Sequence, residues 1–328
     1  MSDHLIKLEH ELQSLMSRKS GRRAFLQAMP LLLAGCATAP TTADRHREGD
    51  NTGQQTSLSY DDERKMTAEY LAEMKKEYPP HKDREVQVYI EELGQKIVQA
   101  NKLHKNPYTY NFTVCDVKNV NAFALPAGTV FVTAPLIAMA QSEAELAGVV
   151  GHEIGHIQAR HTAERMEAQK KSQSKSLLYG IGGAILGGAA GVGLAQLLCK
   201  KEDKECLRRI ALYGAAAGAG GGLLIQKFGF MANSREDEME ADRIGFRTSL
   251  AAGYDKDHIG LFYNRLLEME KQYQSSQSPL LAPLTDAMST HPPSRERVLQ
   301  MEQMARETKA AKGLVSSKKF ERIRDIVS

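Results

Sequence analysis

The chain has 328 residues, of which 42% are hydrophobic and 25% charged, a composition typical of a globular protein with one large or two small domains. Its formal net charge is only +3, and no basic stretch interleaved with aromatic residues occurs, which argues against nucleic acid as a partner. The four cysteines form no Cys-x-x-Cys motif, so a zinc site built from thiolates is not expected.

Residues 1–36 have the pattern of an export signal. Arg22 and Arg23 precede an apolar run, residues 28–33, and resemble a twin-arginine signal, although Gly21 stands where that signal usually has Ser or Thr. We therefore expect these residues to direct export and to take no part in the fold.

The signal ends in Leu-Ala-Gly-Cys36, which resembles a lipobox whose cysteine becomes the lipidated first residue of the mature protein. An ordinary secretory signal with a chance cysteine is the alternative. A start at Met16 instead of Met1 would give the signal a basic head of ordinary length. With lipid on Cys36, the expected location is the bacterial periplasm, anchored to a membrane. The outer membrane is favoured, because Ala37 is not the aspartate that typically retains lipoproteins in the inner membrane.

The next segments are predicted from composition and apolar spacing. Residues 37–57 are rich in Thr, Ala, Asp, Gly and Gln without apolar periodicity, and they indicate a flexible linker. Residues 59–77 and 83–103 carry apolar residues at helical spacing, and Pro79 and Pro80 separate the two stretches. We expect two helices that pack over the later helix described below.

Two β-strands are expected after these helices. Residues 108–117 alternate apolar and polar side chains, as a half-buried strand does, and residues 129–133 have the composition of a second strand. A strand with an exposed edge beside an active-site helix can pair with an extended substrate. Together with the helical patterns, these strands predict a fold that is mainly α with a small β-sheet (α+β).

The segment from His152 to His156 reads H-E-x-x-H and carries the strongest chemical signal. In a helix, two histidines four residues apart point to one side and can share a metal ion. Glu153 then faces the open coordination position, where zinc chemistry needs a carboxylate base. Taken alone, the pentapeptide also occurs by chance on ordinary amphipathic helices.

The helix that carries this motif is predicted to begin at Ser142, which forms a capping box with Glu145. Gly148, Gly151 and Gly155 each cost about 1 kcal/mol of helix propensity relative to alanine. Glycines at such a cost suggest that another element or a substrate approaches the helix closely.

Residues 159–175 are predicted to continue this helix. In a continuous helix His161 lies about 140° around the axis from His156, so it is not expected to be a ligand. The third ligand should be a carboxylate or histidine on a later helix. Residues 234–243 offer Glu238 and Asp242, four apart, so Glu238 can face the metal while Asp242 accepts the second N–H of a ligating histidine. The alternative for such a charged run is a solvated acidic face.

Three further matches accompany these motifs: Glu240 and Ala241 complete E-x-E-A-D, residues 121–132 contain N-A-F-A-L-P, and His291 precedes a Pro-Pro pair. The combination resembles the gluzincin peptidase family that contains HtpX, the CAAX prenyl protease and the bacterial envelope lipoproteins BepA and LoiP. The similar motifs span roughly residues 58 to 300. Ala127 departs from the family pattern, because it replaces the first of two glycines.

The resemblance implies one Zn²⁺ per chain, held by His152, His156 and Glu238. Glu153 is expected to act as general base and then as proton donor to the leaving amine, and Asp242 to orient a ligating histidine. His291 resembles a family histidine that approaches the metal, where it could stabilise the oxyanion or occupy the open site in a resting state. We expect a metallopeptidase domain over residues 58–328.

Residues 177–228 are expected to form a Gly/Ala-rich helical hairpin inserted into that domain. The first apolar run is long enough to span a bilayer and has small-x-x-x-small spacings, so a transmembrane hairpin is one interpretation. The other, favoured because of the low hydrophobicity per residue, is a hairpin packed over the catalytic cleft. Cys199 and Cys206 flank its charged tip and could form a disulfide, whereas Cys115 is expected to be a small buried hydrophobe.

The expected function is a zinc-dependent endopeptidase of the bacterial cell envelope that hydrolyses misfolded or unassembled envelope proteins. The outer-membrane assembly machinery is a further possible partner. A chaperone-like binding protein for outer-membrane protein quality control, with latent proteolysis, is the alternative, although a pure binder has no use for the base Glu153. A prenyl-peptide protease would need a true membrane chamber.

Overall fold

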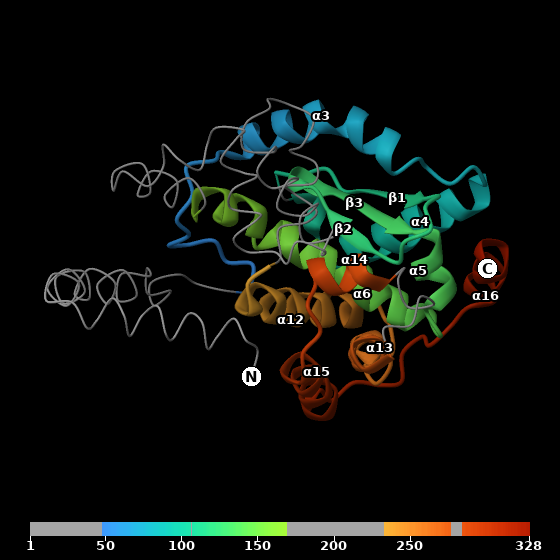
Figure 1. Cartoon of the computed structure of the whole chain (residues 1–328). Coiled ribbons are helices and arrows are strands. Elements are labelled where there is room, and N and C mark those ends of the chain that lie inside the picture. The colour runs from blue at the N-terminus through green and yellow to red at the C-terminus, as the bar shows by residue number, and fades with distance from the viewer. Residues whose placement is uncertain (1–47, 106, 169–232, 277–283) are drawn as a thin grey trace, which may run out of the picture. The chain divides into compact units, whose positions relative to one another are not determined.

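The computed structural model describes residues 48–105, 107–168, 233–276 and 284–328 (Figure 1). Within these ranges the chain is mainly helical with one small sheet, so the predicted α+β class is confirmed. The predicted signal, the first part of the linker, the hairpin of residues 177–228 and the cysteines other than Cys115 lie outside the described residues. None of the described helices has the length and hydropathy needed to cross a membrane.

The sheet has three strands in the order β1–β3–β2. β1 (Asn111–Cys115) runs parallel to β3 (Thr129–Thr133), whereas β2 (Ala122–Ala124) runs antiparallel to β3. β3 has the predicted bounds and β1 is shorter than predicted. β2 is absent from the prediction because three residues are too few to show an alternating pattern.

One face of the sheet packs against α3 (Tyr60–Glu77), where the rings of Phe123 and Phe131 stack with centroids 5.1 Å apart and Met74 closes the cluster. Cys115 lies in the same cluster with a free thiol. Burial raises the pKa of that thiol to about 12, so it stays protonated at neutral pH and is the small buried hydrophobe that the sequence indicates.

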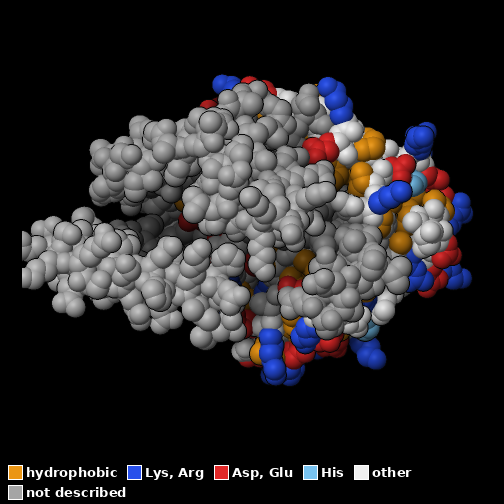
Figure 2. Space-filling view, viewed as in Figure 1, with side chains coloured by type: hydrophobic (Ala, Val, Ile, Leu, Met, Phe, Trp, Pro, Cys, Tyr) orange, Lys and Arg blue, Asp and Glu red, His pale blue; other side chains and the backbone are white. Residues whose placement is uncertain are grey.

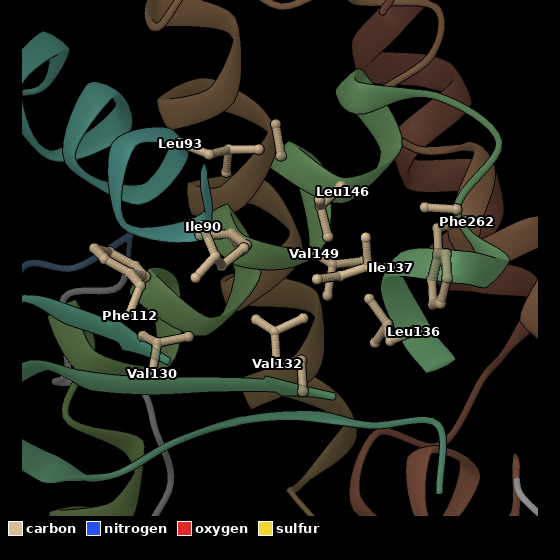
Figure 3. Packing of buried hydrophobic residues seen from close by; sticks show 14 of the residues in the cluster. Ile90, Leu93, Phe112, Val130, Val132, Leu136, Ile137, Leu146, Val149 and Phe262 are labelled. Carbon is tan, nitrogen blue, oxygen red and sulfur yellow. The ribbon is translucent and has the colours of Figure 1, made fainter. Parts of the chain in front are cut away.

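The opposite face of the sheet packs against α4 (Arg84–Ala100) and the larger core. Figure 3 shows Ile90 of α4 close to Phe112 of β1. Val132 of β3 lies between this pair of residues and the residues of the helices that follow β3. Burying side chains of this size contributes about 1.5–3 kcal/mol each. Because both faces are covered, every residue of β3 is buried.

α6 (Glu143–Gln158) begins at the N-cap Ser142, whose side chain accepts the backbone N–H of Glu145. The reciprocal half of the predicted capping box is wrong. The Glu145 carboxylate instead accepts the backbone N–H of Gln141 at 3.1 Å and the guanidinium of Arg265 at 2.8 and 2.9 Å. This contact joins the start of α6 to α13, which is described below.

The predicted continuation of α6 past residue 159 is wrong. Arg160 has a φ of 51°, a left-handed conformation that ends the helix, and its guanidinium bonds the Leu58 carbonyl at 2.6 Å. The same guanidinium lies 3.3 Å from the Glu63 carboxylate. A new helical segment begins at residue 161, so the direction of His161 differs from that expected for a continuous helix.

α12 (Arg235–Ala251) runs alongside α6 (Figure 1), and glycines make the contact possible. A methyl group on Gly151 would lie 2.8 Å from the Gly245 carbonyl oxygen, and one on Gly155 would lie 2.9 Å from the Ala241 carbonyl oxygen. The close approach predicted at the helix glycines is therefore confirmed. It brings the acidic face of α12 next to the two histidines of α6.

The C-terminal helices follow α12 around the core. α12 ends at Ala251, and α13 (Leu261–Ser276) begins after a turn. Short α14 (Thr285–Thr290) leads to α15 (Arg295–Glu307), which packs on α12 and α13. α16 (Lys318–Val327) packs on α4 and on α5 (Ala134–Met139), with Phe320 and Ile323 fully buried.

A turn in left-handed conformation links β2 to β3. It lies in the 3₁₀ segment η3 (Pro126–Gly128), where Ala127 has a φ of 65° and is 8% exposed. The Thr67 hydroxyl of α3 donates to the Pro126 carbonyl at 2.5 Å and holds the turn against that helix. Glycine is the residue best suited to this backbone conformation, so the alanine that replaces it at position 127 is strained.

Residues 48–57, the last part of the predicted linker, lie along the C-terminal end of α6. The Asn51 amide donates to the Gln158 carbonyl at 2.9 Å, and the Gln54 amide donates to the Ala159 carbonyl at 2.7 Å. These bonds supply donors to the carbonyls at the C-terminal end of the helix. For residues 48–57 the structure therefore shows specific contacts in place of a free tether.

Candidate metal centre

Four side chains converge on one point between α6, α12 and α14. His152 and His156 come from α6, Glu238 from α12, and His291 is the C-cap of α14. One ligand atom from each lies within 4.8 Å of every other. The first three side chains are buried, and His291 is 14% exposed.

The two helical histidines present the same ring atom to this point. His152 Nε2 and His156 Nε2 are 3.0 Å apart, and the Glu238 carboxylate oxygens lie 3.4 and 3.3 Å from them. His291 Nδ1 lies 3.2 Å from His152 Nε2 and 3.1 Å from Glu238 Oε1. The structure thus brings the predicted ligands together, as the two four-residue spacings indicated.

Glu153 lies beside the group and is 2% exposed. Its Oε1 atom is 3.5 Å from His291 Nε2, so His291 stands between Glu153 and Glu238. A small pocket adjoins Glu153 and His152 on one side. Its wall is largely apolar and comes from β2, α5, α6, α13 and α14, including Ala122, Leu136, Val149, Phe262, Leu266 and Ala287.

Asp242 faces the second ring nitrogen of His152. Its Oδ1 atom lies 2.8 Å from His152 Nδ1, which leaves Nε2 for the centre of the group. Arg297 of α15 holds this carboxylate in a two-point contact, with Nε and Nη2 each 2.7 Å from an Asp242 oxygen. The same guanidinium reaches Glu238 Oε2 at 2.7 Å and lies 4.8 Å from the Tyr263 ring centre.

Arg297 is only 2% exposed and is absent from the sequence prediction. Burial would raise the pKa of Asp242 and of Glu238, but the charge of Arg297 outweighs it, and both pKa values are lowered. The two carboxylates therefore stay ionised inside the protein. A charged residue in the first turn of a helix usually lies on the surface, so no signal in the sequence marks Arg297 for this position.

The charge balance of the group favours a cation. Burial lowers the pKa of His152, but Glu238 and Asp242 outweigh it and raise that pKa to about 9. Burial and the neighbouring His152 lower the pKa of His156 well below its ordinary value. Imidazole nitrogens and a buried ionised carboxylate are donors that zinc prefers, so this donor set fits the expected ion.

His161 and Glu240 form a second pair of buried residues next to the group. His161 Nδ1 lies 2.7 Å from His156 Nδ1, and His161 Nε2 lies 3.3 Å from Glu240 Oε2. Both side chains are fully buried. Sequence reasoning missed this contact, because it placed His161 on a continuous helix that the turn at Arg160 interrupts.

Asn233, which precedes α12 in the chain, also contacts this group of side chains. Its Nδ2 atom donates to Glu238 and lies 3.3 Å from both His156 Nε2 and the Thr290 carbonyl oxygen. It therefore connects α6, α12 and the end of α14 at the group itself. The sequence gives no pattern for an asparagine at this position.

Comparison with known proteins agrees with this geometry. Residues 80–305 match Peptidase family M48. The beta-barrel assembly-enhancing protease of Escherichia coli K12 is 27% identical over 248 residues, which are 75% of this chain and 44% of that protein. A Vibrio cholerae serotype O1 protein with a name of the same type is 31% identical over 253 residues, 77% of this chain and 46% of its own length.

A mitochondrial relative extends the likeness. The metalloendopeptidase OMA1 of Saccharomyces cerevisiae is 27% identical over 225 residues, which are 65% of this chain and 54% of that protein. The chain spans about half the length of the curated relatives that it matches. Because the family match covers the sheet, the H-E-x-x-H helix and the acidic helix α12, the chain belongs to Peptidase family M48.

Proposed function

We propose that this chain is a zinc-dependent endopeptidase of the bacterial cell envelope. The observation that carries the proposal is the convergence of His152, His156 and Glu238 on one point, with Glu153 beside it. Family membership supports a metallopeptidase. The proposed domain comprises residues 58–328, after a signal at 1–36 and a linker that starts at residue 37.

The proposed zinc ligands are His152 Nε2, His156 Nε2 and a carboxylate oxygen of Glu238. Zinc in such a site supplies an activated water and polarises the carbonyl group that is attacked. Asp242 Oδ1 lies 2.8 Å from His152 Nδ1, and its negative charge favours the tautomer that carries the proton on Nδ1 and keeps the lone pair on Nε2. Arg297 keeps Asp242 ionised and in place.

Glu153 is the proposed proton carrier. It takes a proton from the attacking water and passes it to the nitrogen of the leaving amine. His291 Nδ1 lies within 4.8 Å of the proposed ligand atoms, so it would be a further residue able to hold the ion. With substrate present, the same imidazole would donate a hydrogen bond to the developing oxyanion.

The pocket beside Glu153 supports a preference for apolar side chains. Because Glu153 delivers its proton to the leaving nitrogen, the residue that contributes this nitrogen lies next to Glu153. Its side chain then enters the pocket formed by Val149, Phe262 and Leu266. Misfolded or unassembled polypeptides expose such side chains, which native envelope proteins bury.

The sequence and the relatives' names support a proposal for the substrates, partners and location. The Escherichia coli and Vibrio cholerae relatives are both named for beta-barrel assembly, so unfolded envelope proteins are the proposed substrates and the outer-membrane assembly machinery is a proposed partner. We propose a lipid anchor on Cys36 in the periplasm. Cys36→Ser should release the protein from membranes, and membrane association that survives a carbonate wash would favour a membrane-inserted hairpin at residues 177–228.

Zinc content and cleavage of an unfolded protein test the catalytic proposal. Glu153→Gln should keep zinc and lower turnover by about 100-fold or more, because the general base is lost. Glu238→Ala should lose most of the zinc. Cleavage by Glu153→Gln at the wild-type rate would overturn the mechanism. A wild-type protein that prevents the aggregation of unfolded protein but does not cleave it would favour the chaperone-like alternative.

A further inference from the structure

The ring of His156 has a second nitrogen whose partner lies outside the proposed metal site. If Nε2 binds zinc, Nδ1 must carry the ring proton, because a ligating imidazole is neutral. That proton needs an acceptor inside a buried environment. His161 Nδ1 lies within reach, at 2.7 Å.

The position of this proton fixes which atom donates and which accepts in the next hydrogen bond. His161 Nδ1 accepts from His156, so its own proton is on Nε2, and Nε2–H points to Glu240 Oε2 at 3.3 Å. A second carboxylate oxygen, Oδ1 of Asp237, lies 3.8 Å from the same nitrogen. Glu240 is fully buried, and an ionised carboxylate there needs several donors.

Two of those donors come from the N-terminal segment. The backbone N–H groups of Glu48 and Gly49 donate to Glu240 Oε1 at 2.6 and 3.1 Å. Both residues have positive φ, 73° and 80°, which aims consecutive N–H groups at one oxygen. The Glu48 side chain also pairs with Arg243 and Arg247 of α12, and this contact fastens the segment to the same helix.

We propose that His161 and Glu240 are positioning residues for the zinc ligand His156, and that the backbone at residues 48 and 49 completes this hydrogen-bond chain. The inference rests on the proposed zinc site. Asp242 and Arg297 orient His152 in the same way, so each helical ligand has its own buried carboxylate. For His156 the carboxylate acts through an intervening imidazole.

The chain of contacts gives the N-terminal segment a role in the metal site. Without the backbone N–H groups of residues 48 and 49, Glu240 loses two hydrogen-bond donors. The hydrogen bond that Glu240 accepts from His161 Nε2–H then changes in strength. His161 is then free to turn, and His156 loses the acceptor that fixes its proton on Nδ1. Partners of this kind typically affect metal affinity by about 10–100-fold.

The test compares zinc dissociation constants, by competition with a chromophoric chelator, in full-length variants. His161→Ala should bind zinc about 10–100-fold more weakly and shift the visible absorption of the cobalt-substituted protein, because the geometry at His156 changes. His161→Asn should recover most of the affinity, since its carbonyl oxygen can accept the His156 proton. The matched control is His258→Ala, a histidine that pairs with Asp255 at 2.6 Å and takes no part in these contacts.

Two further variants test the outer part of the chain. Glu240→Gln should weaken zinc binding although it is isosteric, because an amide that donates to His161 opposes the required tautomer. Gly49→Pro should weaken zinc binding, because proline cannot adopt φ 80° and lacks the N–H. Gly53→Pro disrupts a neighbouring turn of φ 78° that makes no bond to Glu240, and it should keep wild-type affinity.

The outcomes separate the inference from the function on which it rests. A wild-type protein that binds no zinc would overturn both. If the wild type binds zinc and His161→Ala has the same zinc affinity and the same cobalt spectrum, the inference alone is overturned. Equal losses in His161→Ala, His161→Asn and His258→Ala would do the same, because they would indicate general destabilisation.

Discussion

The backbones of Gly245 and His152 are in direct contact, so that a methyl group on Gly245 would lie 2.6 Å from the His152 nitrogen. Gly245 is in α12, seven residues after Glu238, and His152 is in α6. The glycine therefore sets how closely the acidic helix approaches the histidine helix. The distance between the proposed carboxylate ligand and the two imidazoles depends on this contact.

Gly245→Ala should destabilise the protein and weaken zinc binding together. Forcing a methyl group into a closed helix crossing costs about 1–3 kcal/mol, and separation of the helices moves Glu238 away from the histidines. Urea unfolding and zinc titration measure the two effects. Gly253→Ala is the control, because Gly253 has a φ of 86° but open space around it. That variant should lose stability through backbone strain and keep its zinc affinity; equal zinc affinity in both variants would contradict the prediction.

The sequence indicates the inner part of the site because its ligands follow local spacing. His152 and His156, like Glu238 and Asp242, are four residues apart on helices, so their common direction can be predicted. The residues that hold these side chains in place cannot be predicted in this way, because they follow no local spacing. Arg297 reaches Asp242 from α15, 55 residues further along the chain.

His161 illustrates the second limit of sequence reasoning. Its direction depends on the left-handed turn at Arg160, a residue that rarely adopts such a conformation. Periodicity assumes that the helix continues, so it places His161 on the wrong side. β2 was not predicted for a different reason, because a strand of three residues at the edge of a sheet is too short to show an alternating pattern. His291 was identified only through the family resemblance.

Arg297→Met should destabilise the protein most strongly when zinc is absent. The substitution leaves the buried carboxylates of Asp242 and Glu238 without their guanidinium, and loss of one partner of a buried pair costs about 3–5 kcal/mol. Bound zinc supplies positive charge beside Glu238, so the loss should be smaller in the zinc-loaded protein. Thermal unfolding with zinc and with a chelator measures the difference.

Arg297→Lys is the matched variant for this prediction. It keeps the charge but cannot form the two-point contact with Asp242, so it should restore only part of the stability. A loss of the same size with zinc and with chelator would show that Arg297 acts through packing against Tyr263 instead of through charge.

Ala127→Gly should stabilise the protein, although most substitutions by glycine do the opposite. The left-handed backbone at Ala127 costs about 1–2 kcal/mol for a residue with a Cβ. Glycine removes that strain but gives the unfolded chain about 0.4–1 kcal/mol of additional conformational entropy. The expected net gain is about 0.5–1 kcal/mol in urea unfolding. Ala124→Gly in β2, where the backbone is extended, should lose stability; a loss at both positions would show that Ala127 is unstrained.

The pocket beside Glu153 gives a prediction about cleavage preference. Leu266 of α13 is 3% exposed and forms part of the pocket wall, so Leu266→Ala should enlarge the pocket. For peptides that differ only in the residue after the cleaved bond, kcat/KM for Phe relative to Leu should rise by about 10-fold or more, since filling apolar space is worth about 1–3 kcal/mol. A ratio of two substrates does not depend on the fraction of active enzyme, so loss of stability cannot produce this result.

Leu261→Ala is the control for this preference, because Leu261 lies in the same helix but is 42% exposed. Its ratio should equal that of the wild type. Val149 of α6 lines the same pocket and precedes Glu153 by one helical turn, so Val149→Phe should narrow the space and favour small side chains. Opposite shifts in Leu266→Ala and Val149→Phe would place the side chain of the leaving residue between α6 and α13. Unchanged ratios in both variants would show that this side chain binds elsewhere.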